Sequence, residues 1–333
     1  MQKTLRGNSV VDVDKFINKK NFLLSCEFLD NESILHILLC FDDNYALSAG
    51  VDIISIIENN NEQQIHFHIF THNVSDNNRK KFAAIKSHNT SITEYVINEQ
   101  FKIDQKNTEL FPIAACVRLI APMILKDVTK KLLYVDSDTL CLKKFDFINE
   151  ISLNNAIVAA VADEPYMQDS QCAKYHVTYG TYFNSGVMLI NIPLWYQENI
   201  TSKTLKLLNS GEKYHYPDQD VLNIVVGEKR IILAKKYNNL LALSINGNED
   251  SSVPEDTVLI HYITKNKPWH QPYRSKLYDL YLEKSPWKND SLILYNDKKT
   301  SSIRAYSRLM FKQKKYLASV KHYLIYLRTK FTK

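Results

Sequence analysis

The sequence predicts an α/β protein whose centre is a doubly wound, mostly parallel mixed sheet of the Rossmann-like kind. Short apolar runs alternate with segments of helical spacing along most of the chain, as expected for strand–helix units. At 333 residues with 45% hydrophobic side chains, the chain is long enough to bury a full core. Glycine is scarce at 7 residues, which argues against collagen-like chains, flexible linkers and glycine-rich phosphate loops.

The first strand–helix unit follows a mixed, polar segment over residues 1–33, which we expect to be a short extension lying on the core. Residues 34–41 form an apolar run bounded by polar residues and are predicted to be a buried parallel strand. An Asp-Asp-Asn-Tyr turn comes next at 42–45. Residues 47–58 then carry apolar side chains at helical spacing, so this unit has the order strand, turn, helix.

The second and third strands are predicted at residues 65–70 and 91–96. In the former, Ile and Phe alternate with His66 and His68. A helix is expected to begin at residues 74–76, where Asn and Ser side chains are candidates for its N-cap.

The fourth strand is predicted at residues 131–135 and ends directly in Asp136-Ser137-Asp138. Before it, residues 112–126 are predicted to form an apolar helix that Pro122 interrupts. The later predicted elements are strands at 156–162, 186–192 and 258–260 and a helix at 219–226. The composition then shifts toward Tyr, Lys and Arg, which places a boundary near residue 270.

Asp136 and Asp138 are the strongest chemical signal, because two carboxylates two residues apart leave the end of an apolar strand. Sheets of this type bind ligands at the carboxyl ends of their strands, so both side chains can project into one site. Hard carboxylate oxygens suit Mg²⁺ or Mn²⁺ and leave room for phosphate oxygens on the ion. The alternative is a solvated turn, in which Asp and Ser are also favoured.

Four further polar segments accompany this pair of aspartates. Asp42, Asn44 and Tyr45 combine carboxylate and amide groups with an aromatic ring, a set suited to holding a nucleobase. The other segments are Tyr182-Phe-Asn-Ser-Gly-Val187, Tyr216-Pro-Asp-Gln-Asp220, and His261-Tyr262 with Lys267-Pro-Trp-His270.

In this order, the five segments resemble the pattern of glycosyltransferase family eight over residues 34–270. Asp-x-Asp and Asn-x-Gly are moderately specific, whereas Pro-Asp-Gln-Asp followed by His-Tyr and Lys-Pro-Trp is highly specific in combination. Ser285-Pro-Trp-Lys288 and the basic tail are similar to the C-terminal extension of bacterial lipopolysaccharide-core glucosyl- and galactosyltransferases. The resemblance implies a GT-A type nucleotide-sugar-binding domain over 34–270 and a helical, basic extension over 271–333.

The resemblance also implies a role for each matching residue. Asp136, Asp138 and His261 would hold Mn²⁺ or Mg²⁺ on the diphosphate of a UDP-sugar; by itself, His261 reads more simply as a core histidine. The residues implied to bind the UDP moiety are Asp42, Asn44 and Tyr45 at uridine, Ser185 where backbone approaches the ligand, and Lys267 at the diphosphate.

Four residues are implied to act at the donor sugar. Arg118 would contact the sugar and Asp136, unless it is a helix-surface charge with its stem on apolar surface. Asn184, Asp218 and Gln219 would line the sugar, with Gln219 beside the anomeric carbon. Asp220 is expected to orient its loop or cap the following helix.

The implied activity is transfer of glucose or galactose, with retention of configuration, to a sugar of the lipopolysaccharide outer core. Retention in two steps needs a carboxylate nucleophile, and front-face attack by the acceptor is the alternative. A non-catalytic UDP-sugar or glycan-binding protein and a glycogenin-like polymer-initiating glucosyltransferase are competing interpretations. The sequence departs from the family pattern at two places, with Thr264 in place of Gly and Ala114-Ala-Cys116 without hydroxyl groups. These departures would favour the non-catalytic interpretation if they have cost the protein its turnover.

The formal charge of +6 includes eleven Lys and Arg after residue 297 and no acidic residue there, so the preceding residues carry −5. Residues 303–328 interleave these charges with apolar side chains at near-helical spacing, which favours an anionic inner-membrane surface as partner. A C-terminal helix packed on the core is the alternative, and no nucleic-acid-binding module accompanies the charge.

Five scattered cysteines without metal-like spacing, and the lack of a signal or membrane-spanning pattern, favour a cytoplasmic protein with reduced thiols, peripheral on the cytosolic face of that membrane.

Overall fold

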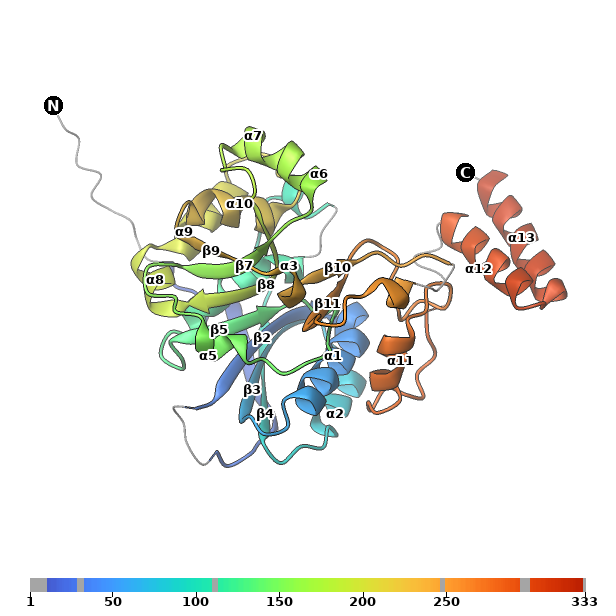
Figure 1. The fold of residues 1–333 in the computed structure, drawn as a ribbon, viewed down its shortest axis with the longest axis horizontal. Coiled ribbons are helices and arrows are strands. Elements are labelled where there is room, and N and C mark those ends of the chain that lie inside the picture. Colours follow the sequence, from blue (N-terminus) through green and yellow to red (C-terminus); the bar gives the residue numbers. More distant parts are fainter. Residues whose placement is uncertain (1–10, 29–32, 110–112, 246–248, 294–299, 332–333) are drawn as a thin grey trace.

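The computed structural model describes residues 11–28, 33–109, 113–245, 249–293 and 300–331. Its centre is an eight-stranded mixed sheet (Figure 1). In spatial order its strands are β1 (Ile17–Leu24), β4 (Thr90–Ile97), β3 (Ile65–His72), β2 (Leu35–Asp42), β5 (Lys131–Val135), β8 (Phe183–Asn191), β7 (Val158–Ala162) and β9 (Arg230–Leu233).

Four neighbouring strands, β4, β3, β2 and β5, are parallel, and β7 and β9 form another parallel pair. Strand β8 runs antiparallel to both of its neighbours. The predicted fold class is therefore confirmed, and each strand predicted up to residue 192 is present within a few residues of its expected bounds.

Helices cover both faces of this sheet, which gives three layers. One core packs odd-numbered residues of β2 and β3, such as Ile37 and Phe67, against α1 and α11. The other core packs the opposite face, including Leu38 and Met188, against α4, α8, α9 and α10. These helices are α1 (Ala46–Asn59), α4 (Ala121–Ile124), α8 (Ile192–Gln197), α9 (Ile200–Leu208), α10 (Pro217–Val226) and α11 (Lys276–Leu282).

Five further helices lie in the described connections between strands. The Ser75 side chain accepts a hydrogen bond from the Asn78 amide at the start of α2, so the predicted N-cap is confirmed. These connecting helices are α2 (Asp76–Ala83), α3 (Ile113–Cys116), α5 (Phe147–Glu150), α6 (Pro165–Met167) and α7 (Ala173–Tyr175).

A second, three-stranded sheet was only partly predicted. It consists of β10 (Asn239–Leu241), β11 (Leu259–Tyr262) and β6 (Thr139–Cys141), in that spatial order. Strand β11 corresponds to the predicted strand at 258–260, whereas β6 and β10 are only three residues long and carry too little sequence pattern to be predicted.

Two predicted elements differ from the structure. The helix expected at 112–126 with an interruption at Pro122 is divided further than expected, since its described part consists of α3, a 3₁₀ turn at Val117–Leu119 and α4. Pro122 lies in the first turn of α4, where its missing N–H costs nothing, so the chain starts a new helix there. Residues 17–24, expected to lie on the core, instead add the antiparallel edge strand β1.

The C-terminal residues form a hairpin of two helices, α12 (Thr300–Lys312) and α13 (Tyr316–Phe331), set to one side of the body (Figure 1). The expectation of a helical, basic extension is confirmed, and the helical spacing over 303–328 is divided between two helices. Lys314 adopts a left-handed φ of 60° between the two helices, which ends α12 and reverses the chain. Among the described residues, none of the helices combines the length and apolar character needed to cross a bilayer.

Candidate functional site

A cleft of about 580 Å³ opens at the carboxyl ends of the central strands. This is where open α/β sheets bind ligands, because loops leaving neighbouring strands diverge there. Eleven of the twelve residues predicted for the site line this cleft: Asp42, Tyr45, Arg118, Asp136, Asp138, Asn184, Ser185, Asp218, Gln219, His261 and Lys267. Asn44 is the exception.

Asp136, Asp138 and His261 form a three-residue group whose oxygen and nitrogen atoms lie within 4.8 Å of one another. The His261 Nε2 atom is 3.2 Å from Asp138 Oδ1 and 3.7 Å from Asp136 Oδ2. Two carboxylates and one imidazole form a donor set that suits Mn²⁺ or Mg²⁺. The residues present therefore fit the divalent ion that the family resemblance implies.

The pairing of β6 with β11 brings His261 to the aspartates although 123 residues separate it from Asp138. In the antiparallel ladder His261 lies opposite Thr139, and the Tyr262 amide donates to the Asp138 carbonyl at 3.0 Å. Because Thr139 directly follows Asp138, this register places the imidazole beside the carboxylates. Asn238 holds the ring from behind, with its Oδ1 3.2 Å from His261 Nδ1.

Gly186 leaves the space into which the imidazole fits. A Cβ atom at this position would lie 2.3 Å from His261 Cε1 and 2.8 Å from Asp136 Oδ2. Real Cβ atoms do not come so close to other heavy atoms, so only glycine allows the three groups to converge here.

Arg118 connects the group of Asp136, Asp138 and His261 to the other half of the cleft. Its guanidinium donates to Asp136 Oδ1 at 2.6 Å and to the Ser185 carbonyl at 3.0 Å, and it lies 3.3 Å from Asp218 Oδ2. Only 5% of the residue is exposed, so the alternative interpretation as a helix-surface charge is wrong. A buried guanidinium with fixed donors holds these acceptors in place.

Lys267 lies on the opposite side of Asp138. Its ammonium donates to Asp138 Oδ2 at 2.6 Å and to the Tyr262 carbonyl at 2.5 Å. Burial by itself would raise the pKa of Asp138, but the charge of Lys267 and the nearby His261 hold that pKa below its usual range. The carboxylate is therefore ionised and ready to bind a cation at neutral pH.

Asn184, Asp218 and Gln219 meet where β8 leaves the sheet and α10 begins. The Gln219 Oε1 atom accepts from the Ser185 amide at 3.0 Å, and the Ser185 hydroxyl donates to Asp218 Oδ2 at 3.1 Å. The Asn184 Oδ1 atom accepts from the Gly186 amide at 3.0 Å. The three side chains are fixed by hydrogen bonds rather than free to rotate.

Asp163 also lines the cleft and was missed in the sequence. It follows the last residue of β7, and its Oδ2 accepts from Gln219 Nε2 at 2.8 Å and from Asn184 Nδ2 at 3.2 Å. An acidic residue directly after an apolar strand is the signal that identified Asp136, and the same signal could have identified Asp163.

Asp220 points away from the cleft into its own loop. It accepts from the amides of His215 and Tyr216, each at 3.0 Å, and from the Tyr175 hydroxyl at 2.9 Å. The expectation that Asp220 orients this loop is confirmed.

Asp42, Asn44 and Tyr45 lie at the end of β2 and in the short turn before α1. Asp42 and Tyr45 face the cleft, but Asn44 is exposed and bonds to the Asp42 side chain, with its amide 3.0 Å from Oδ1. Burial raises the pKa of Tyr45, so its hydroxyl is a hydrogen-bond donor at neutral pH. The Tyr45 ring packs edge-on against Trp269, with the ring centres 5.4 Å apart.

Thr264, one of the two departures from the family pattern, lines the cleft with a φ of 70°. This left-handed conformation is strained for a β-branched residue and unstrained for glycine. The backbone at this position thus has the conformation that favours glycine, although this chain carries threonine there.

Residues 36–272 match the family described as Glycosyl transferase family 8, and residues 274–330 match Glycosyl transferase family 8 C-terminal. The chain is 30% identical to lipopolysaccharide glucosyltransferase WaaO of Escherichia coli (strain K12), over 98% of this chain and 96% of that protein. It is 31% identical to lipopolysaccharide 1,3-galactosyltransferase of Salmonella typhimurium (strain LT2), over 87% of this chain and 89% of that one.

The fold is also similar to a crystal structure of the galactosyltransferase LgtC in complex with donor and acceptor sugar analogs. The TM-score is 0.60 at 21% sequence identity, and the match covers 75% of this chain and 94% of LgtC. At this identity the likeness concerns the fold alone, and it agrees with the GT-A type expected.

Proposed function

Since the chain belongs to glycosyl transferase family 8, we propose that it transfers glucose or galactose from a UDP-sugar to a sugar of the lipopolysaccharide outer core, with retention of configuration. The observation that carries the proposal is the convergence of Asp136, Asp138 and His261 in a cleft of about 580 Å³. A cleft of this volume is in the range of small-molecule sites.

The names of two relatives support both the acceptor and the choice of hexoses. One of these relatives is a lipopolysaccharide glucosyltransferase and another is a lipopolysaccharide 1,3-galactosyltransferase, each at about 30% identity over most of the chain. Glucose and galactose differ at one hydroxyl, so the choice between them depends on contacts at that hydroxyl.

Asp136, Asp138 and His261 would hold Mn²⁺ or Mg²⁺ in this cleft. When bound, such an ion supplies Lewis-acid stabilisation to the departing diphosphate. Lys267, already 2.6 Å from Asp138, would offer its ammonium to the same diphosphate charge. At the uridine end, the Tyr45 ring and the Asp42 carboxylate would bind the base and ribose, with Asn44 supporting Asp42.

Arg118, Asn184, Asp218 and Gln219 would position the hexose. Gln219 and Asn184 are both tied to Asp163, so a sugar hydroxyl in the cleft meets fixed donors and acceptors. We propose front-face attack by the acceptor hydroxyl, because the group expected beside the anomeric carbon is the Gln219 amide. A two-step path would need a carboxylate nucleophile there.

The helical hairpin of α12 and α13 would bring the enzyme to its lipid-linked acceptor at the cytosolic face of the inner membrane. Residues 300–331, which form it, carry eight Lys and Arg and no acidic residue, together with exposed apolar side chains such as Leu317 and Leu324. Apolar and cationic groups together favour an anionic bilayer surface. No part of this proposal requires a nucleic acid.

The proposal is tested by measuring UDP release with Mn²⁺, UDP-glucose or UDP-galactose, and lipopolysaccharide truncated in its outer core. We expect one donor to be used, and we expect Asp138→Ala and chelation with EDTA to lower the rate at least about a hundredfold, since the ion loses a ligand or is removed. Asp127→Ala is the matched control, because Asp127 is exposed and outside the cleft.

Full activity of Asp138→Ala, or in EDTA, would contradict the metal assignment. Tight UDP binding without transfer across donors and acceptors would favour a non-catalytic sugar-nucleotide-binding protein. Incorporation of hexose into the chain itself would favour a polymer-initiating glucosyltransferase.

A further inference from the structure

Three histidines meet on the central sheet at the end opposite to the cleft. His36 lies on β2, and His66 and His68 lie on β3. His36 pairs directly with His66 in the parallel register, and His68 is two residues further along the same strand. Since side chains two residues apart share one face of a strand, all three imidazoles lie on the same face of the sheet.

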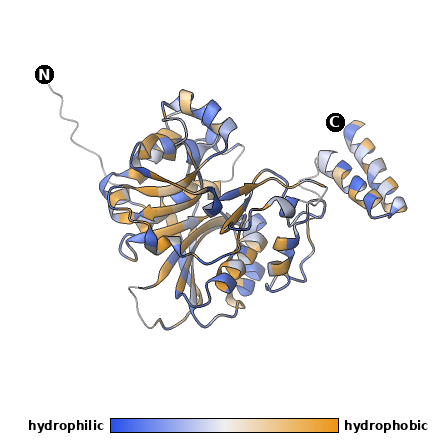
Figure 2. Cartoon of the chain, viewed as in Figure 1, coloured by the Kyte–Doolittle hydropathy of each residue, from blue (hydrophilic) through white to orange (hydrophobic). Residues whose placement is uncertain are grey.

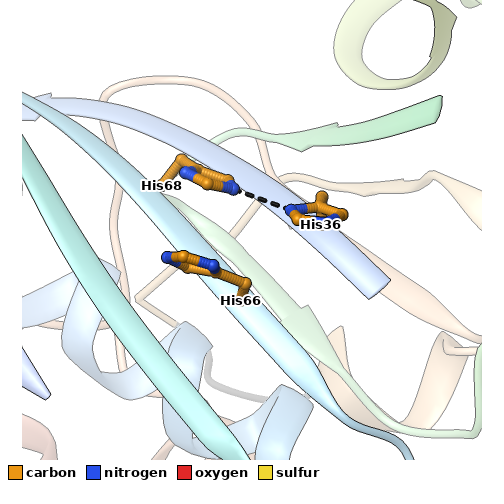
Figure 3. Close-up of side chains that lie close together, drawn as sticks. All are labelled: His36, His66 and His68. Carbon is orange, nitrogen blue, oxygen red and sulfur yellow. Dashed lines mark hydrogen bonds between the residues drawn. The ribbon is translucent and has the colours of Figure 1, made fainter. Parts of the chain in front are cut away.

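The three rings are close enough to bind one ion. Each can present a ring nitrogen, and these nitrogens lie within 4.8 Å of one another. The His36 Nδ1 and His68 Nε2 atoms are 2.9 Å apart, and the His66 ring stacks on His68 with centres 4.2 Å apart. Figure 3 shows the three rings together, with a dashed line for the hydrogen bond between His36 and His68. Nitrogens on a tetrahedral zinc ion at 2.0–2.1 Å are about 3.3 Å apart, so small shifts suffice.

Neighbouring hydroxyl groups orient two of these rings. The Thr93 hydroxyl lies 2.8 Å from His66 Nε2, which leaves Nδ1 of His66 for an ion. The Tyr95 hydroxyl lies 3.4 Å from His68 Nδ1, on the side of that ring away from His36. Metal-binding histidines commonly have such a partner on the second nitrogen, because it fixes the ring and its tautomer.

The three imidazoles are neutral at physiological pH. Burial lowers the pKa of His36 to about 4, and burial with the charges of His36 and Lys20 lowers that of His66 to about 4. His68 is fully buried, and burial holds its pKa well below its usual value. Neutral imidazole is the form that binds metals, so an ion need not displace protons here.

The cluster is accessible to solutes. A separate cavity of about 470 Å³ is lined by His36 and His66 together with apolar residues of the first strand, including Phe22 and Leu24. The thiol of Cys26 also lines it but donates to the His88 carbonyl at 2.9 Å, and Cys26 is not part of the ligand group. Three ligands and an open side leave a fourth position for water.

We propose that His36, His66 and His68 form a zinc site that cross-links β2 and β3. Imidazoles suit Zn²⁺ and related borderline ions, whereas the carboxylate-rich group in the cleft suits Mn²⁺ or Mg²⁺. Six residues of strand separate His36 from Asp42, about 20 Å, so the two sites lie at opposite ends of β2. The zinc site lies outside the cleft, and it is independent of the proposed transferase activity.

The test uses the full-length chain carrying Asp138→Ala, which removes a ligand of the cleft. After chelation, dialysis against micromolar Zn²⁺ is expected to leave about one zinc per chain, since three protein imidazoles hold Zn²⁺ well. Adding His36→Gln and His66→Gln is expected to abolish this zinc, whereas adding His72→Gln, on the same strand but outside the cluster, leaves it bound. Equal zinc content with and without the His36 and His66 substitutions would overturn the proposal.

Two further measurements keep the proposal testable if the multiple variant is unstable. With zinc about a hundredfold above its Kd, we expect the Tm of the Asp138→Ala chain to rise by about 5 °C, and this rise to be lost with His66→Gln alone. Cobalt is expected to give the strong visible absorption of a tetrahedral site. Loss of bound zinc on Cys26→Ser, or no zinc effect on Tm, would overturn the three-histidine ligand set.

Discussion

Gly186 is important because a residue with a side chain would not fit at this position. His261 and Asp136 occupy the volume that a methyl group at this position would need, as close as 2.3 Å to the His261 ring. Neither neighbour is free to move away, because Asn238 contacts the imidazole and Arg118 holds the carboxylate. The close approach of Asp136 and His261 thus requires a residue without a Cβ atom at position 186.

We therefore predict that Gly186→Ala lowers metal affinity and metal-dependent UDP release by about 10- to 100-fold, because the imidazole must shift out of place. Mn²⁺ titration of the activity measures the effect. Gly211→Ala is the control: a Cβ there meets no atom within 4 Å, and the backbone strain of alanine at its φ of 85° acts outside the cleft and leaves the Mn²⁺ dependence unchanged. Equal Mn²⁺ dependence of the two variants would contradict the assigned role of Gly186.

Thr264 is the opposite case to Gly186, because it has a side chain at a position where the backbone conformation favours glycine. We predict that Thr264→Gly raises the free energy of unfolding by about 1 kcal/mol, the strain of a left-handed non-glycine residue less the entropy cost of glycine. Urea unfolding measures it. Thr264→Ser keeps the hydroxyl that accepts from the Asn266 amide and keeps the strain, so it should give no gain. A gain as large for serine as for glycine would argue against backbone strain.

At the scale of elements, the hairpin of α12 and α13 buries only part of its apolar surface. The two helices meet through Ser307 and Ser319 and through the edge-on contact of Tyr306 with His322. Leu317 and Leu324 remain 91% and 59% exposed. In Figure 2, hydrophobic and hydrophilic residues alternate along both helices. Ala305 of α12 nevertheless belongs to the main core cluster, and Lys312 donates to the Ile245 carbonyl, so α12 contacts the body as the alternative expected, whereas α13 exposes most of its apolar side chains.

We predict that the double variant Leu317→Ser, Leu324→Ser binds phosphatidylglycerol vesicles at least about tenfold more weakly, because each buried leucine contributes about 1.5–3 kcal/mol. Vesicle co-sedimentation measures this binding. Leu280→Ser is the control, since Leu280 is 61% exposed but lies on α11, outside the hairpin. An equal loss for Leu280→Ser, or none for the double variant, would rule out the hairpin as the contact.

At the scale of the whole molecule, charge is divided between two regions. The tail after residue 297 carries eleven basic residues and no acidic one, whereas the rest of the chain carries −5. An anionic surface attracts the hairpin and repels the body, which orients the molecule, and the attraction weakens as salt is raised.

The stability of the whole chain should depend on pH through the buried histidines. Their pKa is lowered in the folded state to about 4 for His36 and His66, so between pH 6.5 and 4 the unfolded chain binds more protons. Their stabilisation is complete above pH 6.5 and lost as pH falls toward 4. For metal-free protein we predict a loss of about 2 kcal/mol per histidine between pH 7 and 4.5, as an upper bound.

Urea unfolding of metal-free wild type and of the variant His36→Gln, His66→Gln at the two pH values isolates this contribution, because other titrating groups are common to both. The variant should lose less stability than wild type on acidification. An identical loss in the two proteins would mean that these histidines do not titrate on unfolding.

The sequence by itself determined the elements and most of the chemical groups. Apolar runs specify strands such as β2 and β5 through local burial pattern, and acidic residues at their ends mark the cleft, because both signals lie within a few neighbouring residues. The same locality explains the misses. A 3₁₀ turn at Val117–Leu119 breaks the predicted helix before Pro122 is reached, and Lys314 reverses the tail where no glycine or proline marks a turn.

Only the tertiary structure decided which of these groups meet. His261 reaches Asp138 through the register of β6 and β11, two strands too short to leave a pattern in the sequence. Asp163 joins Gln219 across 56 residues, and His36 joins His66 and His68 through the pairing of two strands 30 residues apart. The sequence gives the type of each side chain directly. Proximity between distant residues depends instead on the pairing and register of strands, which form only when the chain folds.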